Sequence, residues 1–222
     1  MGVNRVCRIT VDDNYVTAYI LRLKTSPHSG NTYLNQARNP EKRRGYAQKL
    51  NEISQRKRQN YKGPWEVVGE YMRNNSTSSD KIYVWGWFPG IYVAAQRLSP
   101  TPKAFEGTMH TLSPEVLSER IDEILSTFEK EPPKFIVDSR KDHFPWDRPP
   151  LELWPRTQKG FLPAVPQIAG QYDIMYAKML HENIEPDEAL RYEAMKPFRE
   201  FVMKNYEIVR RPFGTHVLFK RK

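Results

Sequence analysis

The alternation of apolar and polar positions predicts a strand–helix–strand unit in the middle of the chain. The residues from Ile82 to Trp87 are almost all apolar and stand between turn-forming residues, which is typical of a buried strand. Residues 113–130 follow with apolar side chains at helical spacing, and their first three residues, Ser-Pro-Glu, form a strong helix start. Residues 134–138 predict a second buried strand. Two strands joined by one helix fit a parallel pair with a right-handed crossover.

Helices and a hairpin are predicted on either side of this unit. Pro64 opens a stretch with apolar residues at helical spacing, which predicts a helix there. A proline-rich stretch from residue 139 to residue 170 is interpreted as a loop. A helix is expected over residues 186–205, and Pro197 should kink or divide it. Residues 206–220 predict a β-hairpin around a Pro-Phe-Gly-Thr turn. Shorter helices are expected at residues 91–96 and 171–182.

These elements predict an α/β domain over residues 64–222, with a small, mostly parallel sheet, flanking helices and a C-terminal β-hairpin. The charge of the N-terminal part sets it apart from this domain. Residues 1–64 hold 13 Lys and Arg against four Asp and Glu, whereas the rest of the chain holds 22 of each kind. Because apolar residues are also sparse there, we expect residues 1–63 to form a basic, partly flexible N-terminal arm.

Charge alone leaves three interpretations of the basic arm. Anionic lipid head groups attract Lys and Arg, the phosphates of nucleic acid attract them too, and a solvated segment needs no partner. The sequence has neither the aromatic RNA-binding signature nor a paired-cysteine motif, which disfavours nucleic acid. The longest apolar run, residues 83–95, is interrupted by glycine and proline, so we expect the chain as written to be soluble.

The sequence contains no motif for a cofactor or a metal. The single cysteine, Cys7, excludes an intrachain disulfide and a zinc site built from cysteines. The five histidines are scattered, and no glycine-rich phosphate-binding loop occurs. We therefore expect neither a metal nor a cofactor.

Residues 80–101, with the sequence DKIYVWGWFPGIYVAAQRLSPT, form a distinctive pattern. An acid and a base lead into a buried strand, and a glycine–proline turn, a tyrosine, an arginine and a Pro-Thr pair follow. The pattern resembles the segment after the last membrane helix of bacterial glycosyltransferases of the dolichyl-phosphate-mannose-protein mannosyltransferase type, which include the aminoarabinose transferases. The matching residues are Asp80, Lys81, Val84, Trp85, Gly86, Pro89, Tyr92, Arg97, Pro100 and Thr101.

The resemblance implies a non-catalytic role. Members of that family span the membrane many times and transfer a sugar from a polyprenyl-phosphate carrier, and their catalytic acid lies in a loop between early membrane helices. Only their soluble C-terminal domain corresponds to this chain, so no catalytic residue is carried over. The resemblance implies a domain at the extracytoplasmic face of a bacterial membrane that aids binding of acceptor or carrier. The partners it implies are the membrane portion of a transferase, a glycan or polyprenyl-phosphate sugar, and an anionic membrane surface beside the basic arm.

Five residues are candidates for binding a ligand. A strand that ends in Gly-x-x-Pro-Gly turns sharply, and α/β sheets bind ligands at the carboxyl ends of their parallel strands. Trp85 and Trp87 share one face of the strand, where they can stack on a sugar ring, pack against lipid or belong to the core. Tyr92 and Arg97 can line the same crevice, although an arginine also suits a helix C-terminus. Asp138, at the end of the second strand, completes the set.

A second hypothesis makes the chain an independent soluble α/β enzyme. Asp138, Asp142 and His143 lie in the loop 138–143, directly after the second strand, where many α/β enzymes place a general base. A polar loop that caps the strand accounts for the same residues. In a third hypothesis the chain is a basic module that contacts a membrane or nucleic acid.

Overall fold

The chain divides into two units in the computed structural model, residues 1–61 and residues 62–222. The structure describes residues 62–86, 88–103, 108–140 and 148–222, together with residues 48 and 52. Except for those two residues, the basic arm lies outside the described part of the chain, so its contact with a membrane or nucleic acid stays a prediction. No helix within the described part is both long enough and apolar enough to cross a bilayer.

Helices and short strands follow one another along residues 62–222. In chain order the elements are α4 (Pro64–Asn74), β1 (Ile82–Trp85), α5 (Gly90–Ala95), the 3₁₀ helix η1 (Met109–Thr111), α6 (Pro114–Lys130), β2 (Phe135–Asp138), β3 (Arg156–Thr157), β4 (Gly160–Phe161), α7 (Pro166–Asn183), α8 (Pro186–Ala194), α9 (Lys196–Asn205), β5 (Tyr206–Ile208) and β6 (Val217–Arg221). The predicted loop 139–170 thus contains the β3–β4 hairpin and the first turn of α7.

Proline and capping side chains fix where the helices begin. α4 starts at Pro64, and the backbone N–H of Gly63 donates to Oε2 of Glu66 at 2.8 Å, which closes a capping box. The side chain of Ser113 accepts from the first turn of α6, as the Ser-Pro-Glu start predicts. The helix predicted over 186–205 is divided at Met195 into α8 and α9, with Pro197 in the first turn of α9. The predicted division is therefore confirmed.

Four strands form a mixed sheet in the order β1-β2-β6-β5. β1 and β2 are parallel, whereas β6 runs antiparallel to both β2 and β5. The α/β class, the parallel pair and the C-terminal hairpin are confirmed. A mostly parallel sheet is not, because the hairpin brings the chain back against β2 and makes two of the three pairings antiparallel.

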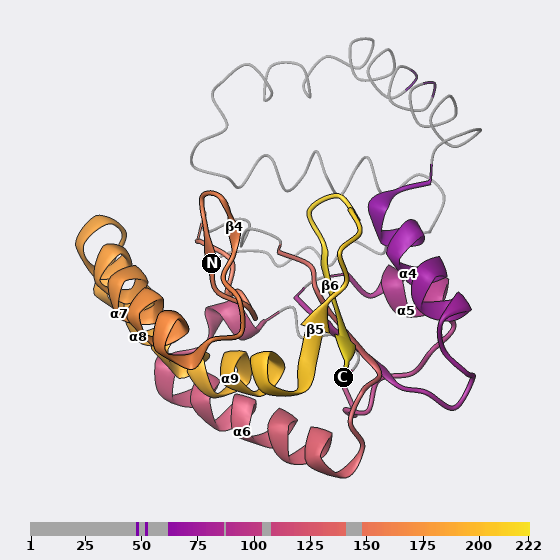
Figure 1. Cartoon of the computed structure of the whole chain (residues 1–222), viewed down its shortest axis with the longest axis horizontal. Helices are drawn as coiled ribbons and strands as arrows, with labels where there is room; N and C mark the ends of the chain where they lie inside the picture. The colour runs from indigo at the N-terminus through magenta and orange to yellow at the C-terminus, as the bar shows by residue number, and fades with distance from the viewer. Residues whose placement is uncertain (1–47, 49–51, 53–61, 87, 104–107, 141–147) are drawn as a thin grey trace, which may run out of the picture. The chain divides into compact units, whose positions relative to one another are not determined.

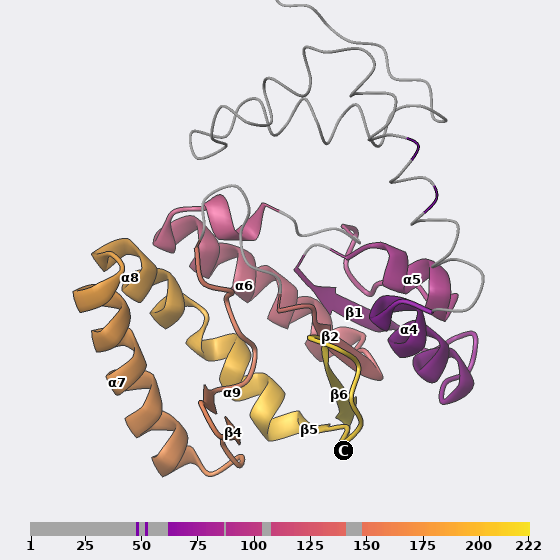
Figure 2. The ribbon, with the colours of Figure 1, turned by 90° about the horizontal axis from the view of Figure 1, so that it is seen from above.

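Two helical layers cover the two faces of the sheet (Figures 1 and 2). Tyr83 and Trp85 belong to the core between the sheet and helices α6 and α9, whereas Ile82 and Val84 belong to the core under α4 and α5. Figure 2 shows the two helix pairs on opposite sides of β1, β2 and β6. Every residue of β1 and β2 is buried, as the apolar runs predict.

Candidate functional site

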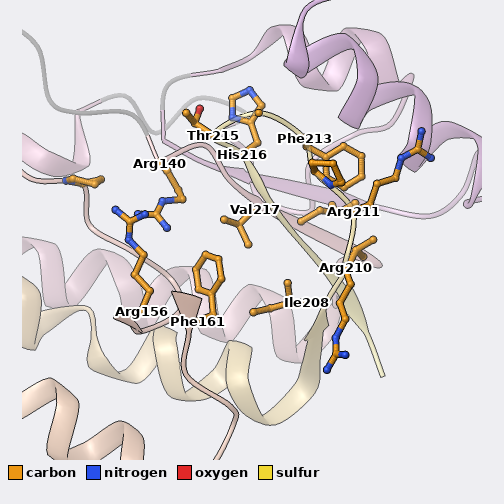
Figure 3. A pocket seen from close by; sticks show the side chains of 15 residues that line it. Arg140, Arg156, Phe161, Ile208, Arg210, Arg211, Phe213, Thr215, His216 and Val217 are labelled. Carbon is orange, nitrogen blue, oxygen red and sulfur yellow. The ribbon is translucent and has the colours of Figure 1, made fainter. Parts of the chain in front are cut away.

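The candidate site is a groove of about 570 Å³ near the carboxyl end of β2 (Figure 3). Its walls come from the loop after β2, from β3 and β4, and from the turn between β5 and β6. Among the described residues that line it there are four arginines and no Asp or Glu; the arginines are Arg140, Arg156, Arg210 and Arg211. The volume is that of a typical small-ligand site, and the planar guanidinium groups suit phosphate or carboxylate.

Asp138 ties the strand end to the chain that forms one wall of the groove. Its Oδ1 accepts from the backbone N–H of Arg140 and its Oδ2 from the backbone N–H of Leu153, both at 2.9 Å. Burial raises the pKa of Asp138, while the two N–H donors and the charge of Arg140 act in the opposite direction. The carboxyl group therefore joins the end of β2 to the backbone of Leu153, which lies 15 residues further along the chain.

Glu152 organises the first two arginines of the groove. It forms ion pairs with Arg140 and, at 3.0 Å, with Nε of Arg156. The side chains of Glu152 and Arg140 are only 7% and 6% exposed, whereas that of Arg156 is 48% exposed. Burial raises the pKa of Glu152, and the two arginines oppose this rise. One buried carboxylate thus positions two guanidinium groups, and the carboxyl group of Asp138 also interacts with the charges of both.

The turn between β5 and β6 presents the other two arginines. Gly214 adopts a φ of 64°, which glycine tolerates, and Phe213 and His216 form an isolated bridge across the turn. Arg210 and Arg211 precede this turn and are exposed. The guanidinium carbon of Arg211 lies 5.6 Å from the ring centre of Tyr71 and 5.9 Å from that of Phe213. The aromatic rings hold its cationic group on the side of α4, whereas the side chain of Arg210 points the opposite way (Figure 3).

His216 is the buried titratable group of this turn. Its side chain lines the groove, and its Nδ1 lies 3.2 Å from the backbone oxygen of Ser139. Since a carbonyl only accepts, the neutral ring carries its proton on Nδ1. Burial lowers the pKa of His216, and the bond to Ser139 opposes this change.

The structure places Trp85 and Tyr92 in the cores on opposite faces of the sheet instead of in a shared crevice. Trp85 is 4% exposed, packs edge-to-face on Phe198 at 5.3 Å, and donates from its indole N–H to the backbone oxygen of Leu151 at 2.6 Å. Tyr92 lies in the core on the opposite face of the sheet, where its hydroxyl accepts from the backbone N–H of Val84 at 2.9 Å. This bond satisfies an outward N–H of the edge strand β1. Trp87 lies outside the described residues.

Arg97 caps a helix. Its Nη2 donates to the backbone oxygens of Arg73 and Ser76 at 3.1 and 2.7 Å, and its Nε donates to Oγ of Ser76 at 2.9 Å. These are groups at and just beyond the end of α4, so the alternative role of a charge at a helix C-terminus is the one the contacts favour. The helix is α4, however, and not the helix that directly precedes Arg97.

Of the four predicted residues that the structure describes, only Asp138 is bonded to the chain that lines the groove; it does not line the groove itself but holds the backbone of Arg140, which does. The alternative catalytic residues Asp142 and His143 lie outside the described part of the chain. Sequence reasoning missed the groove arginines. The signal was the Arg-Arg-Pro run before the predicted hairpin turn, because an antiparallel hairpin against β2 brings that turn to the carboxyl end of β2.

No group of three or more potential metal ligands occurs among the described residues. No family model matches the chain, and no curated protein does. Among solved structures, the chain is similar to the C-terminal globular domain of an oligosaccharyltransferase from Archaeoglobus fulgidus, with 13% sequence identity and a TM-score of 0.35. The match covers 73% of this chain and 99% of that one. At this TM-score the likeness is distant and settles no question of function.

Proposed function

We propose that residues 62–222 form a non-catalytic binding domain that works beside a membrane glycosyltransferase using a polyprenyl-phosphate-linked sugar. The four-arginine groove is the observation that carries this proposal. It binds the phosphate of the carrier or an acidic group of the acceptor. The sequence pattern of residues 80–101 supplies the link to sugar transfer, and the groove supplies a place for the anion.

Charge and burial around the groove support anion binding. Arg140 and Arg156 are held in place by Glu152, so little side-chain entropy is lost when a ligand binds to them. Arginine pairs bind phosphate through parallel N–H bonds that are stronger than neutral ones. With Glu152 ionised, the four arginines leave an excess of positive charge, which favours a ligand that carries a negative charge.

The engagement of Asp138 supports a binding role over a catalytic one. Both of its carboxyl oxygens accept backbone N–H groups, so its hydrogen bonds are directed into the protein. A general base needs an oxygen within reach of a substrate proton. Asp138 is only 3% exposed, and it serves the groove by holding the backbone of Arg140.

Calorimetric titration with inorganic phosphate and with farnesyl phosphate, a short water-soluble polyprenyl phosphate, tests the proposal. We expect both to bind, and the double variant Arg210→Gln/Arg211→Gln to bind them about tenfold more weakly, because charge-assisted bonds to an anion are lost. The matched control is Lys220→Gln/Arg221→Gln, which removes two exposed charges from the other end of the same hairpin. Absence of binding to either compound, or equal losses in both double variants, contradicts a groove-specific site.

The basic arm has its own test. We expect the full chain to sediment with vesicles that contain anionic lipid and to be released by salt, as attraction of Lys and Arg to lipid head groups predicts. Sedimentation that depends on neither anionic lipid nor salt contradicts the membrane contact.

A further inference from the structure

Helix α7 is apolar on two sides. Its inner side packs on α8 through the buried side chains of Ala177 and Leu180, and Figure 2 shows the two helices side by side at the edge of the domain. Seven of the eleven large apolar side chains that are exposed among the described residues lie between residues 165 and 190. Four of them belong to α7: Ile168, Ile174, Met175 and Met179. A helix that is apolar all round is normally buried, so we expect a partner to cover the outer side of α7.

Apolar residues of α7 follow the spacing of a coiled coil. Val165, at the N-cap, is followed by Ile168, Tyr172, Met175 and Met179, at intervals of three, four, three and four residues. This alternation places them along one stripe of the helix, which we call the α7 seam. Tyr172 is half-buried, and the other four residues of the seam are exposed. Because alternating intervals of three and four are what one helix presents to another along its length, the seam indicates a helix as the partner.

Charge is confined to one half of α7. Lys178, His181 and Glu182 are exposed in its last two turns, whereas the only ionisable acid or base before them, Asp173, is buried. Parallel packing of two such helices sets like charges side by side, and antiparallel packing sets the charged half of each against the uncharged half of the other. The N-terminus of α7 has no side-chain cap, because Val165 is its N-cap residue. Antiparallel packing brings Glu182 of a second copy to that end, where the helix dipole favours a negative charge.

We infer that α7 packs antiparallel on α7 of a second copy of this chain. Tyr172 of each copy then lies opposite Met175 of the other, and Ile168 lies opposite Met179. The same stripe serves both copies, as a two-fold dimer requires. Each copy contributes one side of an 18-residue helix, which is less than the roughly 20 to 30 residues of a standard interface, so we expect a dissociation constant in the micromolar range. No residue of α7 lines the groove, so this contact holds or fails independently of anion binding.

Sedimentation equilibrium of the full chain from about 1 to about 200 μM tests the dimer. We expect a monomer–dimer equilibrium that Met175→Glu weakens at least about tenfold, because it places a charge in the centre of the α7 seam. The matched control is Ile174→Glu. The two side chains are 73% and 72% exposed for Ile174 and Met175, but adjacent helix residues point about 100° apart, so Ile174 lies off the seam. A monomer at every concentration, or equal losses in both variants, overturns the inference.

Cysteine pairing tests the orientation. Cys7, the single cysteine, is first replaced by serine. On oxidation, a mixture of Ile168→Cys and Met179→Cys chains should form disulfide-linked dimers several times more efficiently than either variant alone, because antiparallel packing brings these two positions together. Efficient pairing of each variant with itself overturns the antiparallel arrangement. A chain that stays monomeric and floats with phosphatidylcholine vesicles, and loses this binding in Met175→Glu, overturns the dimer and assigns the outer side of α7 to lipid.

Discussion

The two ends of strand β2 handle charge in opposite ways. Where β2 begins, Lys134 forms an ion pair with Asp80 at 2.9 Å, and their side chains are 35% and 28% exposed. Where β2 ends, Asp138 and Glu152 are buried. Four arginines line a groove there, and its described lining residues include no Asp or Glu. At the start of β2 the two charges balance each other and water screens them. At its end the positive and negative charges are unevenly distributed, and the fold holds them in place.

This difference separates charges that are paired within the fold from charges that are not. A partly exposed pair such as Lys134–Asp80 contributes little and is complete in itself. The carboxylates at the other end are turned inward, onto backbone N–H groups and guanidinium groups. Their acceptor capacity is used within the protein, whereas Arg210 and Arg211 keep N–H donors that no described carboxylate accepts.

The largest effect on stability is expected when the carboxylate of Asp138 is removed. Asp138→Ala leaves the partly buried backbone N–H of Arg140 and the buried backbone N–H of Leu153 without their acceptor, which should lower the free energy of unfolding by about 3 kcal/mol. Asp80→Ala, at the other end of the strand pair, should cost about 1 kcal/mol or less. Urea denaturation followed by tryptophan fluorescence measures both. Similar costs for the two variants contradict the contrast between the ends.

A second effect concerns how tightly the carboxyl ends of the two parallel strands are packed. Gly86, directly after β1, has a φ of 92°, and a Cβ there would lie 2.2 Å from Oγ of Ser139. We expect Gly86→Ala to lower the free energy of unfolding by about 2 kcal/mol, from backbone strain and overpacking together.

The matched control for Gly86→Ala is a glycine in open space. A Cβ at Gly170, inside α7, meets no atom within 4 Å. Gly170→Ala should therefore raise the free energy of unfolding by about 0.5 to 1 kcal/mol, because alanine restricts the unfolded chain and favours the helix. Thermal and urea denaturation of both variants give the two signs. A loss of stability in Gly170→Ala, or none in Gly86→Ala, contradicts this account of the packing.

The sequence predicts the elements of this domain better than it predicts the site, and the reason is physical. Proline starts, apolar periodicity and strand composition act locally, so the bounds of α4, α6 and β2 follow closely from the residues themselves. The groove instead depends on β6 pairing with β2, a contact between residues about 80 positions apart. An indole or a guanidinium group can bind a ligand. In this fold, however, the indole of Trp85 packs on Phe198, and the guanidinium group of Arg97 caps the end of α4.

The smallest effect is expected in the pH dependence of stability from His216. Burial lowers the pKa of this side chain below its ordinary value of 6.5, so the unfolded chain binds a proton more readily than the folded one. The contribution of His216 is complete above pH 6.5 and is lost as the pH falls from there through the lowered pKa.

Comparison with His216→Gln isolates this contribution, because the buried carboxylates titrate in both proteins. Between about pH 7 and about pH 5, the unfolding free energy of the wild type should fall relative to that of the variant, by about 1 kcal/mol or less. Urea denaturation at closely spaced pH values gives the difference curve. A curve of the opposite sign requires a negative partner for the imidazolium at the groove, and a flat curve means that the turn opens to water whenever His216 takes up a proton. Either result contradicts a neutral His216 held rigidly beside the end of β2. The charge balance at this end of the strand then depends on the carboxylates and arginines alone.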